Sequence, residues 1–261
     1  MPKRLKAILT NHFVVAGLAV VAVALAAYAY GISKLGYYHD DWYMLWSAST
    51  RGANSLRALF SIDRPFMGFL YGATYQVLGD NVLGWHIYAL LWRIAGAIAF
   101  YWILSLAFPK LKRVLVLAAI LFVVYPGFLA LPNAATKINH LTGFGTALFS
   151  IAFTLQATQT KHIGWRRVLS VLAVLSTAFY LWLYEYMLGL EALRVVLMFW
   201  LYSQVKGTQP VQAIKTTAKT YLPYFVVVAL FLYWRLIIFD SSRVATDFDS
   251  IVMQYEVGFG P

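Results

Sequence analysis

The residues best suited to chemistry lie in the segment from Tyr37 to Trp42, which holds the acidic pair Asp40 and Asp41. Two adjacent carboxylates repel each other, so one of them can take up a proton and serve as a general base. The pair can instead hold a divalent cation, whose preferred ligands are oxygens. The structural alternative is that Asp41 only caps a helix running from Trp42 towards Ser49, a position that Asp favours. The pattern leaves these roles open.

Arg64 and Pro65 form a second candidate element. Arginine presents a planar fork of donors that suits phosphate, and proline in the first turn of a helix fixes the backbone. Together they would direct a cation towards the level of the lipid headgroups. An arginine that merely extends to lipid phosphate is the alternative. Arg235, near the outer end of the last apolar run, is a second candidate phosphate ligand.

Ionisable residues within apolar runs add further candidates. His86 and Arg93 are seven residues apart and share a helix face, with Arg93 about 10 Å deeper. A charge inside a bilayer needs a partner, and we expect Glu191 to pair with Arg194 or Arg93. Such a pair either fixes helix packing or lines a substrate site. Four more candidates are Glu185 at a turn, Trp42 as a sugar-stacking platform beside the acidic pair, and Lys137 and His140 in an expected external loop after the third run.

The composition places these residues in a polytopic membrane protein. Of the 261 residues 61% are apolar and 12% are charged, whereas soluble domains are about a quarter charged. The net charge of +11 is explained by basic cytoplasmic loops, so we expect a lipid bilayer and no nucleic acid as partner. The chain has no cysteine, which excludes disulfides, thiolate metal ligands and thiol nucleophiles.

Seven apolar runs approach the ~20 residues that cross a ~30 Å hydrocarbon core. They predict an all-α transmembrane bundle of about seven spans, forming a single membrane domain over residues 1–261. The first run is interpreted as an uncleaved anchor. The runs are Leu9 to Tyr30, Leu83 to Phe108, Val114 to Leu131, Leu141 to Thr158, Val168 to Tyr184, Met187 to Tyr202 and Tyr221 to Phe239.

The piece from Arg64 to Leu78 decides the topology. As a helix it would be about 22 Å long, too short for the hydrocarbon core, so we place it at the outer surface. The N-terminus is then cytoplasmic and the C-terminus external, in agreement with the positive-inside rule. The inner segments hold Lys3, Arg4, Lys6, Lys110, Lys112, Arg113, Lys161, Arg166, Arg167, Lys206, Lys215 and Lys219, and the outer ones hold Asp40, Asp41, Asp63, Asp80, Asp240, Asp247, Asp249 and Glu256.

The first external loop, Gly31 to Leu78, is expected to contain interfacial helices. Apolar and charged residues alternate there at helical spacing, and Ser55 or Asn54 can cap the helix. The residues of this pattern are Leu56, Arg57, Leu59, Phe60 and Asp63. Because the chain stops soon after the last apolar run, we expect it to be the N-terminal module of a longer protein.

Together these features resemble the type C glycosyltransferase superfamily of membrane enzymes, which use polyprenyl-phosphate sugars. The resemblance rests on the topology, on Asp40 and Asp41 soon after the first span, and on Arg64 with Pro65 before the next helix. It implies sugar transfer at the external face of a bacterial plasma membrane to a glycan or lipid acceptor. Asp40 or Asp41 would be the base and Arg64 a phosphate ligand, with Trp42, His86, Glu185, Glu191 and Arg235 as further substrate-binding candidates.

Two other classes of protein remain open. A transporter or flippase would use intramembrane charges to line a substrate path, with a site near the bilayer midplane between repeated halves. The chain shows no obvious repeat and concentrates its acidic residues at one surface, which favours the enzyme. A non-catalytic membrane subunit is the third class. The sequence predicts no definite cofactor; a divalent cation held by Asp40 and Asp41 is the one candidate.

Overall fold

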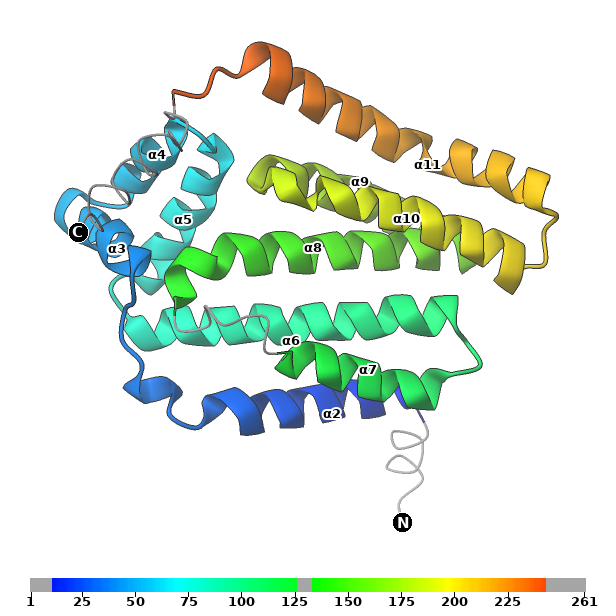
Figure 1. The fold of residues 1–261 in the computed structure, drawn as a ribbon, viewed down its shortest axis with the longest axis horizontal. Helices are drawn as coiled ribbons and strands as arrows, with labels where there is room; N and C mark the ends of the chain where they lie inside the picture. Colours follow the sequence, from blue (N-terminus) through cyan, green and yellow to red (C-terminus); the bar gives the residue numbers. More distant parts are fainter. Residues whose placement is uncertain (1–10, 126–132, 243–261) are drawn as a thin grey trace, which may run out of the picture.

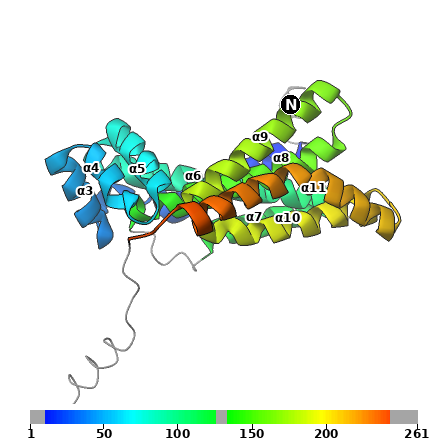
Figure 2. The same ribbon diagram turned by 90° about the horizontal axis from the view of Figure 1, so that it is seen from above.

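The computed structural model describes residues 11–125 and 133–242, which form helices and no strand. Most helices lie side by side in one bundle, and a smaller group crosses its end (Figures 1 and 2). The all-α polytopic bundle expected from the apolar runs is therefore confirmed.

Six segments are long and apolar enough to cross a membrane, which makes the chain an integral membrane protein. The start of α6 shows how such a helix begins: the Asn81 side chain caps it by accepting a hydrogen bond from Gly84 N. The segments contain α2 (His12–Ala24), α6 (Val82–Ala107), α8 (Ala134–Gln159), α9 (Ile163–Leu183), α10 (Gly189–Trp200) and α11 (Pro210–Tyr233). Short π-helical turns extend α2, α10 and α11: η1 (Leu25–Ala29), η4 (Leu201–Val205) and η5 (Trp234–Ile238).

The expected third span, Val114 to Leu131, corresponds to α7 (Lys112–Val124), which has 13 residues and packs against α6 and α2. Such a helix is about 20 Å long, short of the hydrocarbon thickness. The rest of the expected span, beyond residue 125, lies outside the described residues.

Three short helices form a cap over one end of the bundle: α3 (Asp40–Arg51), α4 (Asn54–Ser61) and α5 (Pro65–Leu78). Glycines with positive φ separate them from their neighbours, Gly52 at +82° after α3 and Gly79 at +54° after α5. Gly68 lets α5 approach α4 closely, because a Cβ there would lie 2.7 Å from the Arg57 Cα. The piece from Arg64 to Leu78, expected at the outer surface of the membrane, corresponds to α5, which lies in this cap and not alongside the long helices (Figure 1).

Helix α8 forms the centre of the bundle. In its apolar window 72% of the residues are buried, against 17% for α2 and for α11. Small residues permit this, as membrane helices without a hydrophobic driving force pack most closely where side chains are small. At Gly145 a Cβ would lie 2.8 Å from the Trp92 ring of α6.

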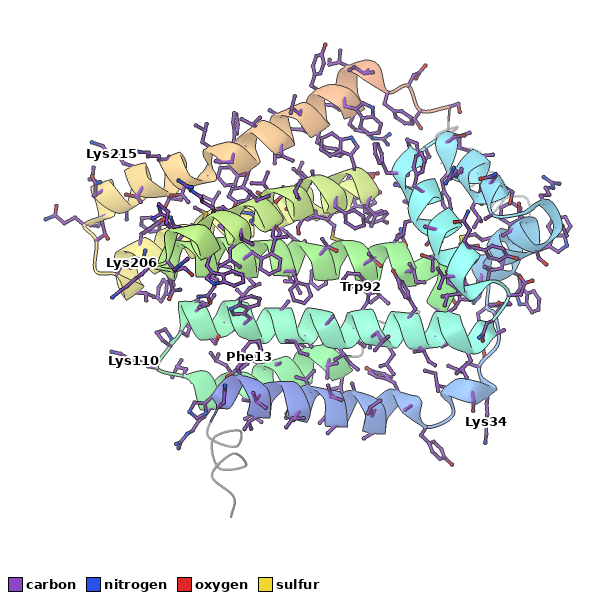
Figure 3. The ribbon with its side chains drawn as sticks, turned by 180° about the vertical axis from the view of Figure 1, so that it is seen from behind. Phe13, Lys34, Trp92, Lys110, Lys206 and Lys215 are labelled. Carbon is purple, nitrogen blue, oxygen red and sulfur yellow. The ribbon has the colours of Figure 1, made fainter. Side chains whose placement is uncertain are left out.

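Basic residues gather at the end of the bundle opposite the cap, which we call the basic end. Lys110, Lys206 and Lys215 lie there, whereas Lys34 lies at the cap end (Figure 3). Three of the lysines expected on the inner side therefore share one end of the bundle, whereas the cap carries Arg51 and Arg57 besides its carboxylates. At the cap end, Ser242 N donates to Ile62 O, so the last described residues lie beside the cap.

Two local expectations were wrong. The fourth span begins at Ala134, seven residues before Leu141, so Lys137 and His140 lie in α8 and not in a loop. Hydropathy missed this polar first part because its stability comes from packing against the cap. The interfacial helix α4 exists, but its N-cap is Ala53, and the Ser55 hydroxyl instead donates to Gly52 O.

Candidate functional site

A cavity of about 330 Å³, the cap cavity, lies between the cap and the bundle. Its size falls within the ~300–1,000 Å³ typical of small-molecule sites. Helices α3, α4, α5 and α8 contribute most of its wall, and Tyr184 closes it from the end of α9. Its polar lining residues are Asp40, Asp63, Arg64, Thr136, Asn139, His140, Tyr43, Tyr71 and Tyr184.

The structure separates the two adjacent carboxylates. Asp40 is exposed and lines the cap cavity, whereas Asp41 is 0% exposed. Successive residues of a helix point about 100° apart, so the Asp40 and Asp41 side chains point in different directions. Of the two alternatives, Asp40 or Asp41 as the base, the geometry therefore favours Asp40.

Asp41 joins the cap to the central helix. Its Oδ1 accepts hydrogen bonds from Thr136 N at 2.7 Å and from Thr136 Oγ1 at 2.5 Å, and its Oδ2 accepts one from Tyr38 N at 3.5 Å. All three partners are donors, as a carboxylate with two acceptor oxygens requires. Of the pair, only Asp40 lines the cap cavity.

Arg64 stands in a cluster of alternating charges at the rim of the cavity. Its Nη2 lies 2.7 Å from Glu185 Oε1, and its Nη1 lies 2.8 Å from Asp63 Oδ2. Arg235 adds a second cation, with Nη2 3.5 Å from Asp63 Oδ1 and 3.9 Å from Glu185 Oε1. The hydrogen bonds with Glu185 raise the pKa of the Arg64 guanidinium above its usual value, so this side chain stays cationic.

Three candidate residues that the sequence suggested separately meet in this cluster. Arg64, Glu185 and Arg235 were separate candidates, and the fold brings all three together, with Arg64 also lying over the Tyr184 ring at 5.2 Å. Asp63 completes the cluster and was missed as a site residue, since only its acidic charge marked it. Pro65 occupies the first turn of α5, as expected, and holds Arg64 directly before the helix.

The floor of the cavity is a polar network at the start of α8. The Tyr71 hydroxyl donates to Thr136 O at 2.7 Å and contacts Asn139 Oδ1 at 3.1 Å. Burial raises the pKa of Tyr71, so its hydroxyl keeps its proton and acts as a donor. His140 Nδ1 lies 2.8 Å from Asn139 Oδ1, and its ring packs on Tyr184 at 4.4 Å between centres. His140 therefore reaches the cavity, as expected, while Asn139 and Tyr71 carried no signal in the sequence.

An apolar groove of about 780 Å³ runs along the other face of α5, between it and α9. Its lining residues are Phe66, Phe69, Leu70, Ala73, Ala178, Phe179, Trp182 and Leu183. Phe69 and Phe179 are exposed, which in a membrane means contact with lipid. Helix α5 thus separates a polar cavity from an apolar groove, with Arg64 at its beginning.

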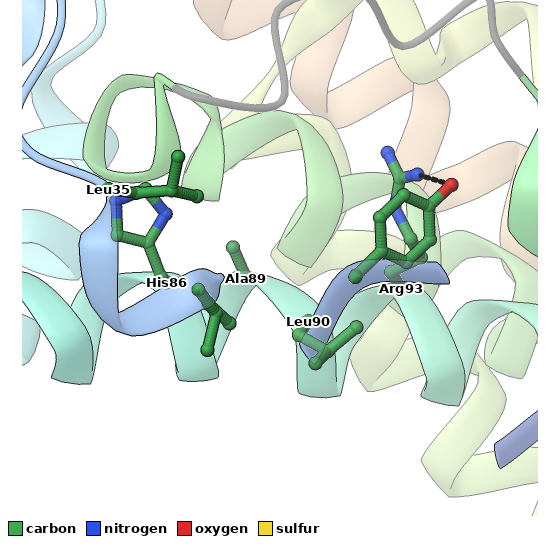
Figure 4. A pocket seen from close by; sticks show the side chains of 7 residues that line it. Leu35, His86, Ala89, Leu90 and Arg93 are labelled. Carbon is green, nitrogen blue, oxygen red and sulfur yellow. Dashed lines mark hydrogen bonds between the residues drawn. The ribbon is translucent and has the colours of Figure 1, made fainter. Parts of the chain in front are cut away.

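Three of the expected site residues lie outside the cap cavity. Trp42 is 61% exposed, packs edge-on against Tyr37 and does not line the cap cavity. His86 is buried, with Nε2 3.0 Å from Gly36 O, and lines a separate cavity of about 90 Å³. Arg93 lines the same small cavity and donates to the Tyr28 hydroxyl at 2.8 Å (Figure 4).

After Trp42 and His86, Glu191 is the third such site residue, and it lies in the bundle interior. It pairs with Arg194 at 2.9 Å, as one of the two expected partnerships predicted, and accepts a hydrogen bond from Tyr180. Arg194 is 0% exposed and donates to Ser150 and to Thr154 on α8. Its other contacts hold α9 and α11 to the same point, at the Thr177 hydroxyl and the Tyr224 ring. This pair fixes helix packing and has no place in the cap cavity.

Comparisons with protein-family models, with curated proteins and with solved structures found no match to this chain.

Proposed function

We propose that this chain is an integral-membrane glycosyltransferase, or the N-terminal module of one, that transfers a sugar from a polyprenyl-phosphate donor. The observation that carries the proposal is the placement of Asp40 and Arg64 on one cavity, beside an apolar groove. An amphiphilic donor needs both surfaces, because its sugar and phosphate require polar contacts and its hydrocarbon chain requires apolar ones. The resemblance to type C glycosyltransferases supports the same reading.

In the proposed reaction Asp40 takes the proton from an acceptor hydroxyl. The oxygen of that hydroxyl forms a bond to the anomeric carbon, and the bond between that carbon and the phosphate oxygen breaks. The lipid phosphate leaves with the electron pair, and the guanidinium of Arg64 stabilises its charge. Arg235 lies close enough to the same carboxylates to share this role. The acceptor is a glycan or a lipid.

The cap end faces the exterior of the cell in this proposal, and the basic end faces the cytoplasm. Support comes from the lysines at the basic end and from the carboxylates of the cap, since loops rich in Lys and Arg remain cytoplasmic. A bacterial plasma membrane is the expected location. The N-terminus would then be cytoplasmic and the C-terminus external.

The test replaces Asp40 by Asn in the full-length protein and follows transfer of labelled sugar from a panel of polyprenyl-phosphate sugars. The matched control is Asp80→Asn, because Asp80 is also exposed at the cap end but does not line the cavity. Loss of a general base reduces the rate about 10²–10⁴-fold, whereas the control should transfer normally. Full transfer by the Asp40 variant would reject the proposed chemistry.

A non-catalytic membrane subunit is the second candidate, favoured by the charge balance around Arg64. Two carboxylates already engage this guanidinium, so a phosphate must displace at least one of them. Under this alternative the cluster only ties the cap to α9 and α11. The transfer assay on the wild-type protein separates the two, because a non-catalytic subunit transfers no sugar. In an active enzyme Arg64→Lys should slow transfer, since lysine keeps the charge but loses the planar fork. A wild-type protein that transfers no sugar from any donor would favour the structural role.

A further inference from the structure

A second large cavity, of about 530 Å³, lies at the basic end of the bundle, remote from the cap. We call it the basic-end cavity. Its wall comes from the last turns of α8, the first turns of α9, the turn η4 and the middle of α11. None of the residues discussed for sugar transfer lines it, so it needs an explanation of its own.

Three cations surround this cavity. Arg166 and Lys219 line it directly from α9 and α11. Lys206 lies beside it, since its Nζ donates to Thr158 O at 2.7 Å and stands 4.8 Å from the Tyr202 ring centre, and both of those residues line the cavity. No Asp or Glu occurs among its described lining residues. The potential within the cavity therefore favours an anion.

Hydroxyl groups form part of the inner wall. The Tyr224 hydroxyl oxygen lies 3.0 Å from Thr154 Oγ1 there. Behind these two groups lies the buried Arg194, which donates to Thr154 and stands 4.3 Å from the Tyr224 ring centre. Ser170 and Thr220 add hydroxyls from the two flanking helices.

The depth of the cavity matches a lipid headgroup and the beginning of its chains. Arg166, Ser170 and Val174 follow one face of α9, and the eight steps from Arg166 to Val174 rise about 12 Å. Arg166 lies near the beginning of α9, and Val174 lies deeper in the same helix. Exposed apolar side chains flank the opening, Leu175 on α9 and Leu222 on α11, where acyl chains would lie.

We propose that the basic-end cavity binds the phosphate of an anionic phospholipid from the leaflet at the basic end. Basic pockets between transmembrane helices recognise such headgroups through lysine and arginine. The site is independent of the proposed sugar transfer, which takes place at the other end of the bundle. A soluble phosphate would use the same cations and hydroxyls but would not need the apolar flanks.

The test compares two double variants of the full chain, purified in detergent, delipidated and titrated with phosphatidylglycerol under native mass spectrometry. Arg166→Gln with Lys219→Gln removes the two lining cations. Arg167→Gln with Lys215→Gln is the matched control, since it removes the same charge from the same helices at exposed positions outside the cavity. Each cation near a membrane surface contributes about fivefold to anionic lipid binding, so the first variant should bind roughly 30-fold more weakly.

The control should bind phosphatidylglycerol like the wild type, and phosphatidylcholine should bind weakly to all three proteins. Equal weakening in both double variants would show general surface attraction and overturn the proposal. A parallel titration with glycerol phosphate distinguishes the ligand source. Should glycerol phosphate bind as tightly as the lipid, the cavity is a site for a soluble phosphate and the lipid assignment fails.

Discussion

Replacing Asp41 by Asn should loosen the cap from the bundle, although Asp41 itself does not line the cap cavity. The side chains are nearly the same size, so the change removes charge and not volume. Asp41 is 0% exposed and accepts hydrogen bonds from Thr136 N, Thr136 Oγ1 and Tyr38 N. An amide has only one acceptor oxygen, and its NH₂ group must therefore face one of the two backbone N–H donors.

The expected cost follows from these contacts. Hydrogen bonds to a charged acceptor contribute about 1.5–3 kcal/mol and neutral ones about 0.5–1.5 kcal/mol, so the two short bonds from Thr136 lose about 1 kcal/mol each. The donor facing another donor adds at least about 1 kcal/mol, because a buried N–H loses its partner. The sum is about 3 kcal/mol, which should accelerate amide hydrogen exchange in α3 about 100-fold if exchange proceeds through detachment of the cap.

The acceleration of amide exchange in α3 is measured directly by hydrogen–deuterium exchange and mass spectrometry of peptides from this helix. Asp40→Asn is the matched control, since Asp40 is exposed and a surface change of this kind costs within about 0.5 kcal/mol. Exchange in α3 that is equal in the two variants would refute the assignment of Asp41 as the tie between cap and bundle. Exchange in peptides of α11 should be unchanged in both.

Two further predictions concern packing. Gly68→Ala should lower the free energy of unfolding by about 1–3 kcal/mol, and with it the midpoint of thermal unfolding, because its Cβ would meet the Arg57 Cα at 2.7 Å. Gly17→Ala is the control and should not lower the midpoint, since nothing lies within 4 Å of the added Cβ. Equal effects of the two substitutions would contradict the close approach of α4 and α5. Glu191→Gln should cost about 3–5 kcal/mol, because it leaves the buried Arg194 uncompensated. The double variant with Arg194→Met should be more stable than Glu191→Gln alone in the same melting assay. A double variant that is less stable would show that the hydrogen bonds from Arg194 to Ser150, Thr154 and Thr177 outweigh its uncompensated charge.

Much of the fold was predictable because it depends on local properties of the chain. A helix that crosses a bilayer must form its backbone hydrogen bonds within itself and be apolar over its length. Apolar runs in the sequence therefore predict transmembrane helices directly. The short length of the Arg64–Leu78 piece likewise placed α5 at the end of the bundle. The polar start of α8 escaped this reasoning, since Thr136 and Asn139 are held by contacts with the cap that no hydropathy window contains.

By itself the sequence determined that this is an all-helical membrane protein, with basic residues at one end and a cap bearing carboxylates at the other. It marked Asp40, Asp41 and Arg64 as the residues of interest but left open which of the two aspartates would be the base. Only the tertiary structure decided that Asp40 lines the cavity while Asp41 is buried against Thr136. It also brought Glu185 to Arg64 across 121 residues of chain. Such pairings depend on how helices rotate and pack, and the long-range contacts that set the rotation leave no pattern in the local sequence.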